Sequence, residues 1–221
     1  RTEFKLSRSI WDAVDDHAGI AAKRGLGLSY VEEDELPQIV LGDPTRFRQV
    51  LDNVLDNALK FTHEGEVSVR TRIISRDECS VRVAFEVSDT GVGIPDCKRD
   101  QVFEAFAQVD QSSSRRYEGT GLGLVIVQRL LERMDGSIDF VSEVDLGTTF
   151  RFELVLALPA KQPATPVKPA LVGPGTRAVL VTSHPSFAES FDTQLRVLGF
   201  HLTTVTDPDE ALRIRREEPP H

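Results

Sequence analysis

The chain is poor in cysteine and in basic residues. The first shortage argues against a cysteine metal site, and the second argues against binding to nucleic acid. Its 221 residues include two cysteines, Cys79 and Cys97, whose spacing matches no metal-binding pattern. We therefore expect two free thiols in a reducing cytosol. Lysine and arginine number 26 against 35 acidic residues, which gives a formal charge of -9. Because duplex binding draws most of its affinity from cationic side chains, we expect no nucleic-acid partner.

Long hydrophobic runs are missing as well. The longest apolar runs are far too short to span a bilayer, and the first five residues contain no signal-peptide pattern. We expect a cytoplasmic chain without direct membrane contact, a location that also fits a longer parent protein anchored in the inner membrane. Apolar residues make up 40% and charged residues 28%, which is typical of a globular protein.

Sequence periodicity predicts one domain that mixes helices and strands. A first helix is expected from Ser7, as its N-cap, to Gly25, and a second begins where Asp43 offers a capping carboxylate before Pro44. We expect strands over 26–31, 67–73, 81–87, 137–141 and 148–158, and further helices over 102–106 and 121–134. This order predicts a two-layer α/β sandwich (α+β), in which helices cover one face of a mixed sheet.

The last quarter of the chain is expected to be separate. Residues 160–176 are rich in proline, glycine and alanine, a composition typical of a linker. A strand over 178–182, a helix over 187–198, a strand over 201–205 and the start of a helix at Pro208 then predict a βαβα segment, which is too short to close a core by itself. The expected organisation is a domain over 1–159, a linker over 160–176 and a segment over 177–221.

A first segment with recognisable chemistry lies on the second helix. Asn53, Asn57 and Lys60 fall at i, i+4 and i+7, so they share one stripe beside the apolar face. Amide oxygens are acceptable ligands for Mg²⁺, and a lysine can reach a phosphate. The alternative is that these are ordinary polar residues on a half-exposed helix.

Two glycine-rich segments complete the pattern. Asp89 ends a strand, where its carboxylate could accept an adenine amino proton, and Gly91 and Gly93 let the backbone approach the base; a plain turn is the alternative. Segment 119–123, with three glycines, precedes a helix whose N-terminal N–H groups favour phosphate; packing is the alternative. Read together, the three segments predict a pocket for ATP and Mg²⁺.

These segments resemble the motifs of sensor histidine kinases, in that family's order. Residues 48–62 resemble the asparagine box, 89–95 the first glycine box, 103–106 the phenylalanine box, 119–124 the second glycine box and 147–150 a strand entry near the end of the domain. The resemblance covers roughly residues 3–159. It implies the Bergerat ATP-binding fold shared with gyrase B and MutL ATPases, with the nucleotide between the helices and a mixed sheet.

The resemblance also implies a role for each site residue. Asp89 would read adenine, Asn57 and Asn53 would bind magnesium, and Lys60 and Arg115 would contact phosphates beneath a mobile lid over 108–118. The expected catalytic set is Asn53, Asn57, Lys60 and Arg115. The expected nucleotide-binding set is Asn57, Lys60, Phe61, Asp89, Gly91, Gly93, Ile94, Phe106, Gln108, Arg115, Gly119, Thr120, Gly121, Leu122, Gly123, Leu124 and Thr149. Within it, Phe61 and Phe106 are expected to pack near the pocket rather than to take part in chemistry.

One position separates a kinase from a hydrolase. In the related ATPases a glutamate that activates water lies one helical turn before the metal-binding asparagine, and here that position is Asn53. A carboxamide cannot accept a proton at neutral pH, so we expect slow hydrolysis and transfer of the γ-phosphoryl group to a histidine. No histidine of this chain fits the acceptor pattern of the family. We therefore expect the acceptor on a separate dimerisation domain of the same parent protein, with a response regulator downstream.

Residues 177–221 resemble the opening of a receiver domain of a hybrid histidine kinase. Ser183 and His184 stand where a receiver carries paired acidic residues, so we favour a degenerate, truncated receiver over an unrelated βα segment. Two other functions stay open for the whole chain. One is a stand-alone ATPase of the gyrase type, which Asn53 disfavours. The other is a catalytically silent module that senses a nucleotide, such as a cyclic dinucleotide effector, and the intact motifs disfavour it.

Overall fold

The chain divides into two compact units. The structure is a computed structural model that describes residues 2–104, 122–160, 162, 176–197 and 199–217. The first unit is Arg1–Pro163 and the second is Ala164–His221.

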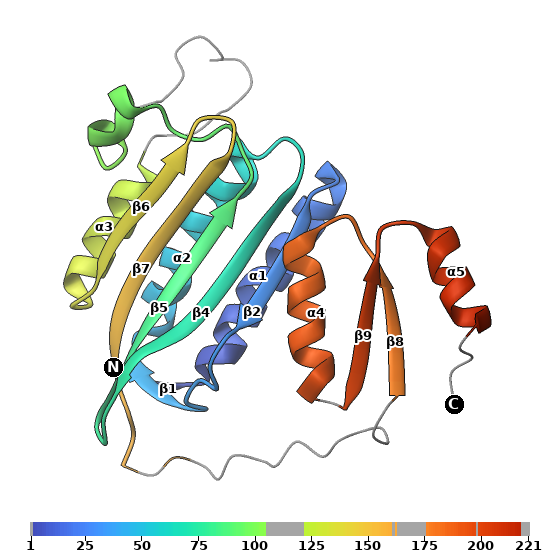
Figure 1. Ribbon diagram of the computed structural model, residues 1–221. Coiled ribbons are helices and arrows are strands. Elements are labelled where there is room, and N and C mark those ends of the chain that lie inside the picture. The colour runs from blue at the N-terminus through green and yellow to red at the C-terminus, as the bar shows by residue number, and fades with distance from the viewer. Residues whose placement is uncertain (1, 105–121, 161, 163–175, 198, 218–221) are drawn as a thin grey trace. The chain divides into compact units, whose positions relative to one another are not determined.

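The first unit is built on a seven-stranded mixed sheet. Its strands are β1 (Thr2–Phe4), β2 (Gly27–Glu32), β3 (Val40–Gly42), β4 (Glu66–Arg76), β5 (Ser80–Asp89), β6 (Ser137–Glu143) and β7 (Gly147–Ala157). Their order is β1-β3-β7-β5-β4-β2, and β6 also pairs with β7 (Figure 1). Strands β2 and β4 are parallel and the other pairs are antiparallel.

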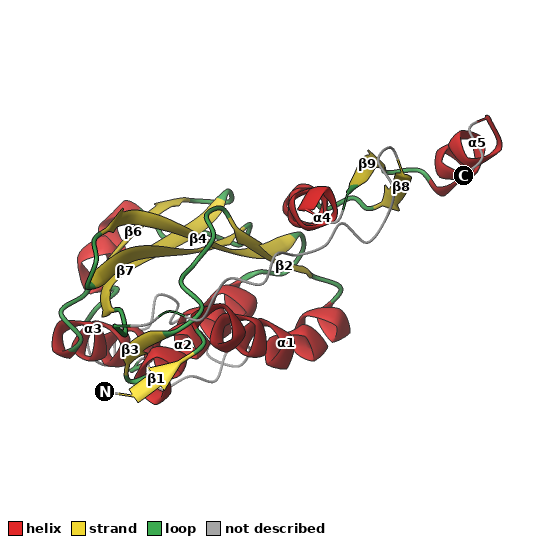
Figure 2. Ribbon diagram, turned by 90° about the horizontal axis from the view of Figure 1, so that it is seen from below, coloured by secondary structure: helices red, strands yellow, loops and turns green. Residues whose placement is uncertain are grey.

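Three helices cover one face of this sheet. They are α1 (Leu6–Arg24), α2 (Pro44–Phe61) and α3 (Gly123–Arg133), and Figure 2 shows all three on the same side of the strands. A 3₁₀ helix over Asp96–Gln101 follows β5. The two-layer arrangement predicted from the sequence is therefore confirmed.

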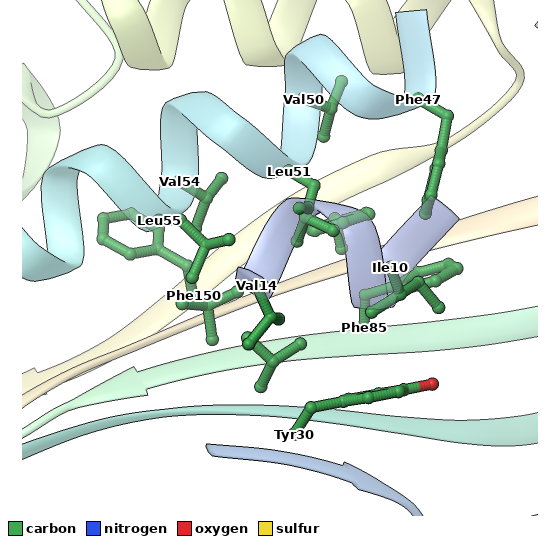
Figure 3. Packing of buried hydrophobic residues seen from close by; sticks show 14 of the residues in the cluster. Ile10, Val14, Tyr30, Phe47, Val50, Leu51, Val54, Leu55, Phe85 and Phe150 are labelled. Atoms are coloured by element: carbon green, nitrogen blue, oxygen red, sulfur yellow. The ribbon is translucent and has the colours of Figure 1, made fainter. Parts of the chain in front are cut away.

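The core forms where α1 and α2 face the sheet. Apolar side chains repeat at helical spacing on α2 and at alternate positions on β5 and β7, so each element has one buried face. Figure 3 shows Val50, Leu51, Val54 and Leu55 of α2 and Ile10 and Val14 of α1 pointing toward the sheet residues Tyr30, Phe85 and Phe150. The Phe85 ring stacks on Phe152 at a centroid distance of 4.8 Å. This packing fixes the rotation of α2 and hence the direction of its polar stripe.

Two expectations about the helices need correction. Ser7 is not the N-cap of α1, because the helix already begins at Leu6, whose side chain is fully buried, and the capping position is Lys5 without a side-chain hydrogen bond. The helix expected over 102–106 is not formed at residues 102–104, and residues 105 and 106 lie outside the described residues. A 3₁₀ helix starts directly after Pro95, whose fixed φ favours the first turn of a helix, and it ends at Gln101.

The cap of α2 follows the prediction. Asp43 lies in extended conformation before Pro44, and its Oδ1 accepts a hydrogen bond from the N–H of Arg46 at 3.0 Å. Strands β1 and β3 went unpredicted because three residues each are too few to show an alternating pattern.

The second unit contains β8 (Thr176–Val181), α4 (Pro185–Val197), β9 (Phe200–Val205) and α5 (Pro208–Glu217). Strands β8 and β9 pair in parallel from Thr176 with Phe200 to Val181 with Val205, so α4 is a crossover helix. Across the described parts of both units, no helix has the length and apolar character that crossing a bilayer requires.

Candidate nucleotide-binding site

Asp89 is the last residue of β5, and its carboxylate is held by one oxygen only. Oδ1 accepts the N–H of Gly91 at 2.8 Å and the N–H of Thr148 at 3.3 Å. Among the described residues no donor reaches Oδ2, although the side chain is only 9% exposed. This oxygen can therefore accept a hydrogen bond from a ligand.

Burial raises the pKa of Asp89 to about 6, and the hydrogen bonds from Gly91 and Thr148 oppose the rise. At pH 7 the group is therefore mainly ionised and accepts hydrogen bonds only. An amino group on a nucleobase is a suitable partner for Oδ2, whereas a carbonyl oxygen in the same place would be repelled.

The backbone around Asp89 is packed too closely for side chains. A Cβ on Gly91 would lie 2.4 Å from the Phe61 carbonyl oxygen, and one on Gly93, at φ +68°, would lie 2.1 Å from the Glu143 carbonyl oxygen. The N–H of Val92 also donates to the Phe61 carbonyl at 3.3 Å. These contacts join the loop after Asp89 to the end of α2 and to the end of β6.

Gly147, which opens β7, is the most constrained of these glycines. Its φ is +111°, and an added Cβ would lie 1.9 Å from the backbone oxygen of Asp89. We expect Gly147→Ala to destabilise the first unit by about 3 kcal/mol or more, since strain and clash act together. Gly19→Ala on α1 is the matched control, because nothing lies within 4 Å of its added Cβ. Chemical denaturation measures both, and an equal, small effect would contradict the expectation.

Asn53 and Asn57 are the only two asparagines of the chain, and both lie on α2 facing the start of α3. A Cβ on Gly123 would lie 3.2 Å from Asn53 Oδ1 and 3.6 Å from Asn57 Nδ2. Asn53 Nδ2 donates to the Gln49 carbonyl at 2.7 Å, which turns its Oδ1 outward from the helix backbone. Within the described part of the chain the Asn57 amide has no hydrogen bond, so its oxygen is available to a metal ion.

Lys60 lies one turn farther along the same stripe. Its Nζ lies 5.1 Å from the centroid of the Phe61 ring, and within the described ranges no carboxylate pairs with it. A lysine held over an aromatic face beside two amides remains able to meet an anion. The asparagines, Lys60 and the loop after Asp89 are thus brought together at the C-terminal half of α2.

The second glycine-rich segment is described only from Leu122 onward. Leu122 is the N-cap of α3, Gly123 is its first residue, and Leu124 packs partly against the core. Ile94 packs against the core in the same way. The expected site residues Phe106, Gln108, Arg115, Gly119, Thr120 and Gly121 lie outside the described residues and stay predictions.

Thr149 is not brought to this site. Its hydroxyl pairs at 2.9 Å with the hydroxyl of Ser88, the neighbour of Asp89 on β5, whose side chain leaves the opposite face of the sheet. Thr148 is the residue on the Asp89 face, and its N–H reaches Asp89 Oδ1. Strict alternation from the buried Phe150 predicts this placement, because Thr148 and Phe150 share a face.

Sequence reasoning also missed Ser142 on β6. Its hydroxyl contacts the loop after Asp89 and the start of β7, where it accepts the N–H of Ile94 at 2.7 Å. No local pattern singles out one serine in a strand, because its role depends on partners from two other segments.

Known proteins are similar to this chain in sequence and in fold. A family profile described as "Histidine kinase-, DNA gyrase B-, and HSP90-like ATPase" matches residues 42–158. The sensory/regulatory protein RpfC of Xanthomonas campestris is 46% identical over 138 residues, which cover 61% of this chain and 19% of that protein. The signal transduction histidine-protein kinase BarA of Escherichia coli is 37% identical over 155 residues, which cover 70% of this chain and 17% of that protein.

Solved structures agree with the sequence relatives. The crystal structure of full-length ShkA in complex with AMPPNP superposes with a TM-score of 0.76 at 29% identity. The match covers 96% of this chain and 42% of that chain.

The fold and the site define an ATP-binding domain of the two-layer type in which helices cover one face of a mixed sheet. The chain belongs to the histidine kinase-, DNA gyrase B- and HSP90-like ATPase family, and its domain is of the histidine kinase catalytic type. The fold expected from the sequence motifs is confirmed. The chain spans about a fifth of the length of the two curated relatives it matches here.

Proposed function

We propose that this chain supplies the catalytic domain of a hybrid sensor histidine kinase. In that reaction a histidine nitrogen on a separate dimerisation domain attacks the γ-phosphorus of ATP. The bond from that phosphorus to the β–γ bridging oxygen breaks, ADP leaves, and the imidazole proton passes to solvent. The relatives support this proposal, because BarA is named as a histidine-protein kinase.

The observation that carries the proposal is the amide of Asn53. It lies one turn before Asn57 on α2 and faces the start of α3, close to where a triphosphate would contact that helix. An amide takes no proton from water at neutral pH, so the position lacks a general base for hydrolysis. The γ-phosphoryl group is then preserved for a stronger nucleophile.

The other residues bind and position the nucleotide. Asp89 accepts the adenine amino group through Oδ2, and Asn57, with Asn53 as second ligand, offers oxygens to Mg²⁺. Lys60 contacts phosphate as a point charge, and Arg115 is a predicted second cation. Mg²⁺ held by Asn57 and Asn53 would supply charge neutralisation at the phosphates, and positioning together with charge neutralisation is most of what phosphoryl transfer requires.

The test is transfer of label from radioactive ATP to a separately made dimerisation fragment. Mixed with the whole chain and Mg²⁺, the fragment should gain a phosphoryl group that is labile in acid and stable in base. The fragment should stay unlabelled when its acceptor histidine is replaced, or when it is mixed with a chain that carries Asp89→Asn. Label that appears without this chain, or that is stable in acid, would contradict the proposal.

Two results would favour the rival functions. Steady release of phosphate from ATP by the chain alone, abolished by Asp89→Asn, would indicate an ATPase of the gyrase type. Calorimetry that finds no Mg²⁺-dependent affinity for ATP would indicate a catalytically silent module. A cyclic dinucleotide effector of such a module has no support from the described residues and stays a prediction.

The second unit is proposed as a degenerate receiver joined by the linker 160–176. Its parallel β8-α4-β9 arrangement supports this, and so does the 96% coverage of this chain by the match to ShkA. Thr182, Ser183 and His184 follow β8, so no carboxylate of that turn is available for a metal ion. The dimerisation domain and a downstream response regulator are the proposed partners, and anchoring of the parent protein in the inner membrane stays a prediction.

A further inference from the structure

The orientation of Asp89 depends on two separate segments. The N–H of Gly91 comes from the loop that follows β5, and the N–H of Thr148 comes from the start of β7. Both donate to Oδ1, which leaves Oδ2 without a donor among the described residues. If either segment shifts, the carboxylate can rotate and present a different oxygen.

The Ser142 hydroxyl of β6 links these two segments. It accepts the N–H of Ile94, which belongs to the loop of Gly91, at 2.7 Å. It also lies 3.0 Å from the Gly147 carbonyl oxygen and 2.8 Å from the Thr148 hydroxyl. A hydroxyl has one donor and two acceptor sites, so donation to Gly147 and acceptance from Ile94 and Thr148 use all three.

We propose that Ser142 is a positioning residue that sets the selectivity of this site for adenine over guanine nucleotides. The inference rests on the proposed function, in which Asp89 Oδ2 accepts the adenine amino group. Because the Ser142 hydroxyl is saturated by protein groups, it acts through Asp89 and not on the nucleotide. It holds the loop of Gly91 and the start of β7 at the spacing that leaves Oδ2 free.

The Ser142 hydroxyl is not needed to hold the β6–β7 hairpin together. Backbone pairing of Ser142 with Thr148 and of Glu143 with Gly147 already holds β6 against β7 without the hydroxyl. The N–H of Asp145 donates to the Val92 carbonyl at 3.0 Å, which holds the loop to the turn independently. Removal of the hydroxyl should therefore leave the hairpin folded and loosen the attachment of the Ile94 loop to β6.

The experiment compares Ser142→Ala, Ser142→Thr and the control Ser137→Ala, which changes an exposed serine on the same strand. Calorimetry measures the binding of Mg·ATP and Mg·GTP to the whole chain. We expect Ser142→Ala to weaken ATP binding about tenfold and to leave GTP binding within about twofold, so the preference for ATP falls about tenfold. Ser142→Thr should retain most of the preference, and Ser137→Ala should retain all of it.

The outcomes separate the two proposals. An equal loss for ATP and GTP, or no loss for either, in a Ser142→Ala chain whose thermal unfolding is unchanged would overturn the role of Ser142. Failure of the unmodified chain to bind Mg·ATP at all would instead overturn the proposed function.

Discussion

Replacement of Asp89 by asparagine is expected to weaken ATP binding at least about 100-fold. The amide oxygen of the variant keeps the hydrogen bonds from Gly91 and Thr148, so the NH₂ group takes the place of Oδ2. Two donors then face each other, because the adenine amino group meets an amide instead of an acceptor, and both are left unsatisfied. Calorimetric titration with Mg·ATP measures the effect.

The same substitution should stabilise the nucleotide-free protein. The folded-state pKa of Asp89 is raised to about 6 from the ordinary value of 3.8, so the protonated form contributes stability below pH 4 that is lost as pH rises through 6. Asparagine has no charge to bury, so at pH 7 we expect Asp89→Asn to be more stable by about 2 kcal/mol. The gain should shrink toward pH 4, and urea denaturation at both pH values measures it.

A matched control is Asp139→Asn, the same chemical change at an exposed position of β6. It should leave ATP binding unchanged. If Asp89→Asn binds ATP as well as Asp139→Asn does, the assignment of adenine recognition to Asp89 is wrong.

Asn57→Ala should remove most of the Mg²⁺ dependence of ATP binding. The Asn57 amide has no hydrogen bond within the described residues and lies beside Gly123 at the start of α3, so its loss frees no protein partner and removes one metal ligand. We expect ATP affinity in Mg²⁺ to fall about tenfold or more, toward the affinity measured with a chelator. Titrations with and without Mg²⁺ give the comparison.

Thr45→Ala, an exposed change in the first turn of the same helix, controls for a general effect on α2. It should leave the Mg²⁺ dependence intact. An Asn57→Ala chain that still responds fully to Mg²⁺ would show that the metal ion is held elsewhere.

The sequence was sufficient to predict the placement of a side chain where that placement follows from local periodicity. The helical spacing of Asn53, Asn57 and Lys60 beside an apolar face predicted a shared stripe, and the packing of α2 on the sheet places them as expected. Asp89 at the end of an alternating strand was predicted from the same kind of pattern. In each case one element and its buried face decide the direction of the side chain.

The sequence was insufficient to predict the placement of a side chain whose contacts depend on pairing between distant segments. Thr149 was chosen for the site, but cross-strand register puts Thr148 on the face of Asp89. Ser142 acquires its role only because β6 returns beside β7 and the loop of Ile94 folds back onto it. Such contacts join residues about 50 positions apart in the sequence, and no short motif encodes them.

The most direct measurement is a crystal structure of the chain grown with AMPPNP and Mg²⁺. We expect the adenine amino group within hydrogen-bond distance of Asp89 Oδ2, and a metal ion that takes the Asn57 amide oxygen as a ligand and bridges phosphate oxygens near the start of α3. A nucleotide whose base lies away from Asp89, or a metal ion that does not contact α2, would contradict this expectation.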